Sequence, residues 1–157
     1  MITQTLSRNL ITAIDPDLHR PGVAIWDLTS RKWLCHAPVH NDEVKDFLSG
    51  FGRDLMTVYI EAGWKHRKAN FRGGKGAAGQ SVARNIGENH AMGKFLSAQL
   101  TRAGFHVIEI PPLKKGFMKV EGKWTPLGRR HLARMSGITA RINDDVRDAV
   151  FIAIHKK

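Results

Sequence analysis

Four acidic residues lie at the ends of apolar runs in a chain that is otherwise strongly basic. Asp15 and Glu61 each end an apolar run, and Asp145 and Asp148 stand at the start of a third. Acids are scarce here, since the chain has 25 Lys and Arg against 14 Asp and Glu. Four of them at the ends of three core elements indicate a carboxylate cluster, and such clusters bind hard divalent cations. A cation site in a basic protein points to hydrolysis of a phosphodiester backbone.

Repulsion among these acids indicates what they would bind. Four clustered carboxylates raise one another's pKa values unless cations intervene. Mg²⁺ meets that need, Mn²⁺ can replace it, and two such ions can activate a water and stabilise the leaving oxygen. Taken singly, Asp15 could be a turn former, and Asp144 and Asp145 could serve a helix dipole. We leave Asp144 with the dipole and assign the cluster from the joint pattern of the other four acids.

The composition limits the classes of partner and compartment. A net charge of +11 and a pI near 10.3 favour a polyanionic partner, although a basic protein without such a partner is the plainer alternative. The one cysteine excludes an internal disulfide. No apolar stretch could span a membrane and no signal pattern opens the chain. We expect one domain, 1–157, in a cytoplasmic setting: nucleoid-associated, or in the cytoplasm of a virus-infected host.

The pattern of apolar residues and turns predicts an α/β fold with a mixed sheet. In this sheet the first and fourth strands would be parallel inner neighbours, which places a ligand crevice at their ends. Predicted helix caps are Asn41, Thr125 and Asn143, and a hairpin is expected to turn at 121–122. The predicted strands are 9–15, 22–28, 32–37, 56–61 and 107–110, and the predicted helices are 42–51, 80–103, a short one from 126, and 144–155.

Two basic segments could contact a nucleic acid. Segment 62–80 contains no acid, and its glycines do not match a phosphate-binding P-loop. Segment 113–134 carries seven Lys and Arg and one acid. Trp64 could stack on an unpaired base beside the metal site, or it could be a core residue. The basic side chains predicted to contact DNA are Lys65, Arg67, Lys68, Arg72, Lys75, Lys114 and Lys115.

Three segments carry a resemblance to a known family. Residues 11–16 followed by Gly22, residues 58–61, and residues 145–155 resemble the acidic motifs of RuvC-type Holliday-junction resolvases, members of the RNase H-like superfamily. The resemblance covers about residues 9–156 and implies an RNase H-like fold with a five-stranded mixed sheet flanked by helices. Asp17 departs from the family, which usually has a glycine there.

The resemblance also implies roles for individual residues. The metal-binding catalytic acids would be Asp15, Glu61, Asp145 and Asp148, holding Mg²⁺, and Trp64 would contact bases near the crossover. Lys114 or Lys115 would match a lysine that contacts phosphate or aids catalysis. The implied enzyme is a two-fold homodimer that resolves four-way junctions by paired symmetric nicks. Its interface would be helix 80–103, where small residues allow close approach: Ala83, Gly87, Ala91 and Ala98.

Other functions remain open at this level. A nuclease of the same fold could act on other branched DNA, on flaps or on structured RNA, because fold does not fix substrate. A nucleic-acid binding module without catalysis would need no metal. An actin-like ATPase is excluded by the chain length and by the missing phosphate loops. No histidine pair has the helical spacing of a zinc enzyme.

Overall fold

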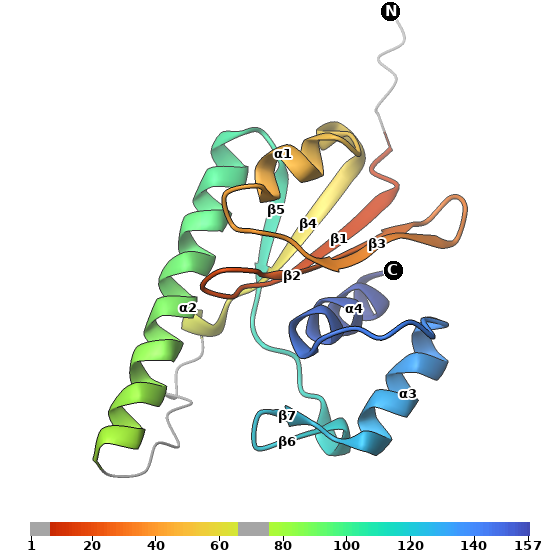
Figure 1. The fold of residues 1–157 in the computed structure, drawn as a ribbon. Helices are drawn as coiled ribbons and strands as arrows, with labels where there is room; N and C mark the ends of the chain where they lie inside the picture. The colour runs from red at the N-terminus through yellow and green to blue at the C-terminus, as the bar shows by residue number, and fades with distance from the viewer. Residues whose placement is uncertain (1–6, 66–75) are drawn as a thin grey trace, which may run out of the picture.

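A mixed sheet of five strands forms the centre of the molecule in the computed structural model, which describes residues 7–65 and 76–157 (Figure 1). The strand order is β3-β2-β1-β4-β5, with β4 parallel to both β1 and β5 and the other pairs antiparallel. The predicted strands and the parallel pairing of the first and fourth are therefore confirmed. The strands are β1 Leu10–Asp15, β2 Gly22–Asp27, β3 Lys32–Pro38, β4 Met56–Glu61 and β5 His106–Ile110.

Helices cover both faces of this sheet (Figure 1). The short helix α1 (Val44–Ser49) and the long helix α2 (Ala77–Arg102) lie on one face, where Leu48 and Leu96 pack with Ile14. Helices α3 (Pro126–Ser136) and α4 (Asp144–Lys156) lie on the other, where Phe151 packs with Ile11. Alternate residues of β1 thus feed two separate cores, as period-two strand geometry requires.

A two-stranded hairpin lies between β5 and α3. Its strands are β6 (Lys119–Val120) and β7 (Lys123–Trp124), and it turns at Glu121 and Gly122, where both φ angles are positive. The predicted turn at this place is confirmed. Single 3₁₀ turns span Arg53–Leu55, Gly63–Lys65 and Gly116–Met118. None of the helices in 7–65 and 76–157 combines the length and apolar composition that a bilayer span requires.

Two predicted helix starts are wrong. Helix α1 begins at Val44 instead of residue 42, and Asn41 does not cap it, because its amide donates to the carbonyls of Asp17 and Leu18. Helix α2 begins three residues before the predicted residue 80, so the glycine at 79 is helical. Val82 is 46% exposed because the first turns of α2 extend beyond the sheet (Figure 1).

Candidate active site

Two of the predicted acids meet at one edge of the sheet. Strands β1 and β4 run parallel and in register up to the pair Ile14 and Ile60. The next residue of each strand is Asp15 or Glu61, so both carboxylates leave the sheet at the same end. Each is partly exposed, while Ile14 and Ile60, directly before them, are fully buried. The chain continues from β1 to β2 on one side and later places β4 on the other side of β1. Ligands of open α/β sheets bind at such a switch point, and here the two acids lie at it.

Helix α4 supplies the other two acids. The side chain of Asn143 accepts a hydrogen bond of 2.8 Å from the backbone N–H of Val146, which fixes the start of the helix. Asp145 and Asp148 are three residues apart and share one helix face. Gly22 makes this approach possible, because a Cβ there would lie 2.1 Å from the carbonyl oxygen of Asp145. The start of α4 therefore packs directly on the backbone of β2.

All four acids line one cavity of about 250 Å³. The strand ends and the helix face thus bring together the residues that the sequence pattern grouped, while their catalytic role stays a prediction. The other lining residues come from the turns after β1 and β4, from α2 and from the hairpin: Pro16, Gly63, Trp64, Ile86, Asn89, His90 and Lys119.

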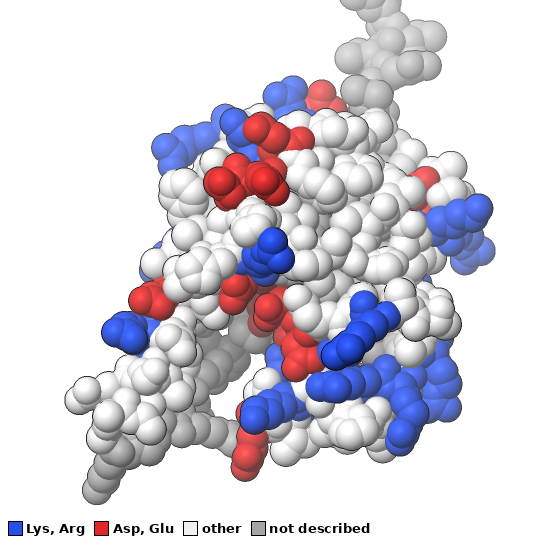
Figure 2. Space-filling view, in the orientation of Figure 1, with Lys and Arg blue, Asp and Glu red and all other residues white. Residues whose placement is uncertain are grey.

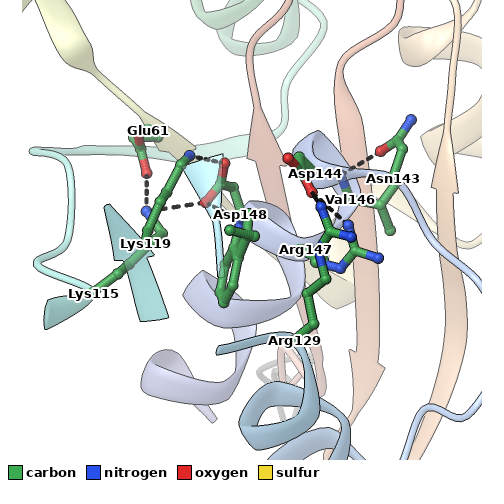
Figure 3. Close-up of polar contacts among 10 residues, drawn as sticks. Glu61, Lys115, Lys119, Arg129, Asn143, Asp144, Val146, Arg147 and Asp148 are labelled. Atoms are coloured by element: carbon green, nitrogen blue, oxygen red, sulfur yellow. Dashed lines mark hydrogen bonds and ion pairs between the residues drawn. The ribbon is translucent and has the colours of Figure 1, made fainter. Parts of the chain in front are cut away.

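Two lysines partly neutralise this cluster (Figure 3). Lys115 Nζ lies 3.2 Å from Asp148 Oδ1 and 3.7 Å from Glu61 Oε2, and its side chain is only 7% exposed. Lys119 Nζ donates to Asp148 Oδ2 at 2.5 Å, and the indole N–H of Trp124 donates to Asp148 Oδ1 at 3.2 Å. Both oxygens of Asp148 are therefore engaged within the protein.

The pocket nevertheless fits an added cation. Glu61 Oε2 is buried and accepts no hydrogen bond from residues 7–65 or 76–157, since the 3.7 Å to Lys115 is too long for one. Burial, followed by repulsion from Asp148, Glu61 and Asp145, raises the pKa of Asp15 well above its usual range. Burial also raises the pKa of Glu61, although Lys115 opposes this. The nearby lysines therefore do not fully compensate the charges of Asp15 and Glu61, and a divalent ion would supply the missing positive charge.

The charge balance sets how much cation the pocket can hold. Among the described residues, four carboxylates face two ammonium groups, so two negative charges are left uncompensated by them, which matches one divalent ion. In the described part of the chain, no three Asp, Glu, His or Cys residues already converge as a ligand set. Side chains would therefore have to shift for a metal to bind, with the two lysines yielding part of the space.

Stability of the metal-free protein is expected to depend on pH through Asp145. Burial, and then repulsion from Asp17 and Asp148, raises the pKa of Asp145 to about 6. The folded state thus binds this proton more tightly than the unfolded chain, so stability should fall as pH rises from about 4 to 6. Thermal melts of wild type and Asp145→Asn in EDTA would show this as a difference between them. The variant should lose less stability over that range, and parallel melting curves would contradict the assignment.

The structure gives Lys114 and Lys115 different surroundings. Lys115 is the residue that pairs with Asp148 and Glu61 behind the cavity lining, whereas Lys114 is exposed to solvent. Lys119 and Trp124 were not predicted from the sequence, although both contact Asp148 directly. The predicted hairpin turn was the available signal for Lys119, because the first strand of the hairpin begins at this lysine, directly after the buried Met118.

Other predicted contact residues have mixed surroundings. Trp64 lines the pocket but is half-buried against α2, where a Cβ at Gly93 would lie 2.5 Å from its ring. Lys65 Nζ pairs with Glu109 at 2.9 Å, so part of its charge is already used. The predicted DNA-binding residues Arg67, Lys68, Arg72 and Lys75 lie outside the described residues.

Asp17, which departs from the family pattern, has a local role. Its Oδ2 accepts hydrogen bonds from the backbone N–H groups of His19 and Arg20, each at 2.9 Å. Such an arrangement closes the turn between β1 and β2, as aspartate commonly does. Its charge still reaches the pocket, because it contributes to the raised pKa of Asp145.

Comparisons with known proteins identify the fold. No family model and no curated protein sequence matches the chain. Among solved structures, "T. thermophilus RuvC in complex with Holliday junction substrate" aligns with a TM-score of 0.55 and 14% identity over 92% of this chain and 90% of that one. A second Thermus thermophilus RuvC structure aligns with a TM-score of 0.54 and 14% identity over 92% and 91% of the two chains. The chain therefore has the RNase H-like fold of RuvC.

Proposed function

We propose that this chain is a metal-dependent endonuclease that resolves four-way DNA junctions by paired symmetric nicks, working as one nuclease domain. The observation that carries the proposal is the convergence of Asp15, Glu61, Asp145 and Asp148 on one cavity of a RuvC-like fold. The RuvC structure with a Holliday junction supports branched DNA as the substrate. The basic charge of the chain supports a nucleic acid in general.

The four acids would hold Mg²⁺, for which Mn²⁺ can substitute. When two ions are bound, they supply an activated water and stabilise the leaving oxygen of the phosphodiester. Asp15 and Glu61 would provide oxygens from the sheet edge, and Asp145 from the helix. Asp148 would complete the set once Lys115 and Lys119, which occupy its oxygens in the free protein, yield part of the space. We expect the free protein to hold one ion tightly, because the described side chains leave two negative charges uncompensated, and a second once a phosphate adds its charge.

The chain's own cations and aromatic ring would position the substrate. Lys119 is 24% exposed and lines the cavity, so its ammonium group can reach a phosphate bound there. Trp64 lines the same cavity, so its ring could stack on an unpaired base. We propose that Lys65 and Lys114 make further contacts to the DNA arms, together with Arg67, Lys68, Arg72 and Lys75.

A two-fold dimer would supply two equivalent sites, as two matched nicks require. One face of α2 supports it, since the small residues predicted there are exposed. Phe95 lies on the same face and is 54% exposed, which makes it an apolar contact for a partner helix. These exposed residues are Ala83, Gly87, Ala91 and Ala98.

Phe95→Glu is expected to convert the dimer into monomers. A carboxylate at the centre of an apolar helix interface would be buried without a partner, which costs several kcal/mol per charge. Sedimentation equilibrium measures the state directly, and Asn85→Glu, which changes an exposed position on the opposite side of α2, is the control. A wild type that sediments as a monomer at micromolar concentration would contradict the dimer.

Cleavage of defined substrates tests the proposed function. A synthetic immobile four-way junction is incubated with the protein and Mg²⁺, with and without EDTA, beside a flap, a duplex and a structured RNA. We expect paired nicks in the junction, related by symmetry, that disappear in EDTA. Preferred cutting of the flap or RNA would favour a related nuclease. Binding without metal-dependent cutting would favour a binding module and contradict the proposal.

A further inference from the structure

A second cavity lies on the other side of the start of α4. It has a volume of about 610 Å³ and is bounded by the end of β3, the loop before α4 and helix α3. Its floor is apolar, from Ala37, Pro38, Ile142 and Val146. Three arginines line the cavity, and we call it the arginine groove: Arg129 from α3, Arg141 from the loop and Arg147 from α4.

Two of the three arginines of this groove lie beside one acid, Asp144 (Figure 3). Asp144 Oδ1 accepts a short hydrogen bond from Arg147 and lies 3.8 Å from Arg129. Arg147 is only 14% exposed, so this pairing fixes its guanidinium group. Arg141 is exposed and makes no ion pair with any acid in the described part of the chain. Three positive charges therefore face one negative charge.

The start of α4 joins this groove to the acid pocket. Consecutive residues divide the two sites, since Asp145 lines the acid pocket and Asp144 lines the arginine groove. Figure 2 shows the same division at the surface, with a strip of acidic side chains beside Lys and Arg gathered over α3 and the start of α4. A strand whose phosphate enters the acid pocket would run across this boundary.

We propose that the arginine groove binds a phosphodiester of the same DNA strand whose neighbouring phosphodiester is held in the acid pocket. Arginine suits this ligand, because its planar guanidinium group donates two parallel hydrogen bonds to phosphate oxygens. The apolar floor suits the deoxyribose between phosphates. Contacts of this kind carry no sequence information, but they fix the register of the strand relative to the metal centre. This inference rests on the proposed function.

Asp144 acts as a positioning residue in this site. It holds the guanidinium groups of Arg129 and Arg147 side by side before any ligand arrives, which reduces the entropy lost on binding. The sequence assigned Asp144 to the helix dipole, and its place in the first turn of α4 is compatible with that as well. Its contacts with two arginines add the organising role.

A matched pair of double variants tests the groove. Arg129→Gln with Arg141→Gln removes two charges from the groove, and Arg130→Gln with Arg134→Gln removes two exposed charges of α3 that do not line it. Binding to a fluorescent junction and to a duplex is measured in EDTA, across a salt series. We expect the groove variant to bind about 10-fold more weakly and its log–log salt slope to fall by about 1 to 2, with the control within about threefold of wild type. Equal losses in the two variants would overturn the groove.

The replacement Asp144→Ala gives a test of opposite sign. If long-range charge alone governed binding, removing this acid would tighten DNA binding. We expect binding to weaken by about threefold or more, because Arg129 and Arg147 are then no longer held together. Melting curves check that the variant remains folded. Unchanged or tighter binding would overturn the organising role of Asp144.

The outcomes separate this inference from the proposed function. If wild type shows no preference for the junction, yet the groove variant loses affinity for every DNA, the groove stands and junction resolution fails. If wild type cuts the junction and the groove variant binds like wild type, the function stands and the groove fails.

Discussion

Asp15→Asn is expected to abolish DNA cleavage while leaving junction binding close to wild type. Asparagine keeps the shape of the side chain at the end of β1 but removes one of the anionic oxygens proposed to hold Mg²⁺. Metal stabilisation of a phosphodiester transition state is worth several kcal/mol, so the cleavage rate should fall by about 10³-fold or more. Single-turnover cleavage of a junction in Mg²⁺ measures the rate, and anisotropy in EDTA measures binding.

The same variant should not be less stable than wild type without metal. Burial and the neighbouring carboxylates raise the pKa of Asp15, so its ionised form is unfavourable in the folded state. Removing that charge should raise the melting temperature in EDTA, whereas Mg²⁺ should stabilise the variant less than wild type. Asp46→Asn is the control, since Asp46 is 83% exposed on α1 and does not line the pocket. Cleavage by Asp15→Asn at the wild-type rate would contradict the assignment of the site.

The sheet and the meeting of the acids could be predicted because both depend on local patterns. Asp15 and Glu61 each follow an apolar run, and parallel pairing then places both at the same sheet edge. Asp145 and Asp148 share a helix face whose start is fixed by the Asn143 cap. Gly22, noted only as part of a motif, is explained by its contact with the backbone of Asp145.

The partners of Asp148 could not be predicted, because they depend on how segment 111–125 folds back onto the sheet. This segment has no long periodic run, and its hairpin strands have only two residues each. The register that directs Lys115, Lys119 and Trp124 toward Asp148 comes from tertiary packing, including the close approach of Gly128 to the backbone of Met118. Sequence spacing alone left Lys114 and Lys115 equivalent.

The arginine groove was missed for a similar reason. Arg129, Arg141 and Arg147 belong to different elements, and in the sequence they resemble other basic residues of the second half of the chain. Only the packing of α3 beside the start of α4 brings them to one cavity. Charge composition predicted a polyanion as partner, but the location of its binding sites could be identified only from the fold.

Lys115→Met is expected to destabilise the metal-free protein by about 3 kcal/mol, because removing one partner of a buried ion pair leaves charge uncompensated. Lys115 is 7% exposed and lies between Asp148 and Glu61. In the variant these two acids would still face Asp15 and Asp145, and Lys119 would be the remaining cation among the described residues of the pocket. Methionine keeps most of the apolar stem against Phe151, so the change reports mainly on the charge. The melting temperature in EDTA should fall by about 6–12 °C.

Added Mg²⁺ should restore much of this loss, because a divalent ion can take over the charge that Lys115 supplied. A ligand that binds only the folded state stabilises it in proportion to the logarithm of its concentration over Kd, so the melting temperature of Lys115→Met should rise more steeply with Mg²⁺ than that of wild type. Lys114→Met, at the exposed neighbouring position, should melt like wild type in both conditions. Equal responses of Lys115→Met and wild type to Mg²⁺ would show that lysine and metal do not share the pocket. The steeper response would instead establish that the same carboxylates bind an internal ammonium group in the free protein and a divalent ion in the active one.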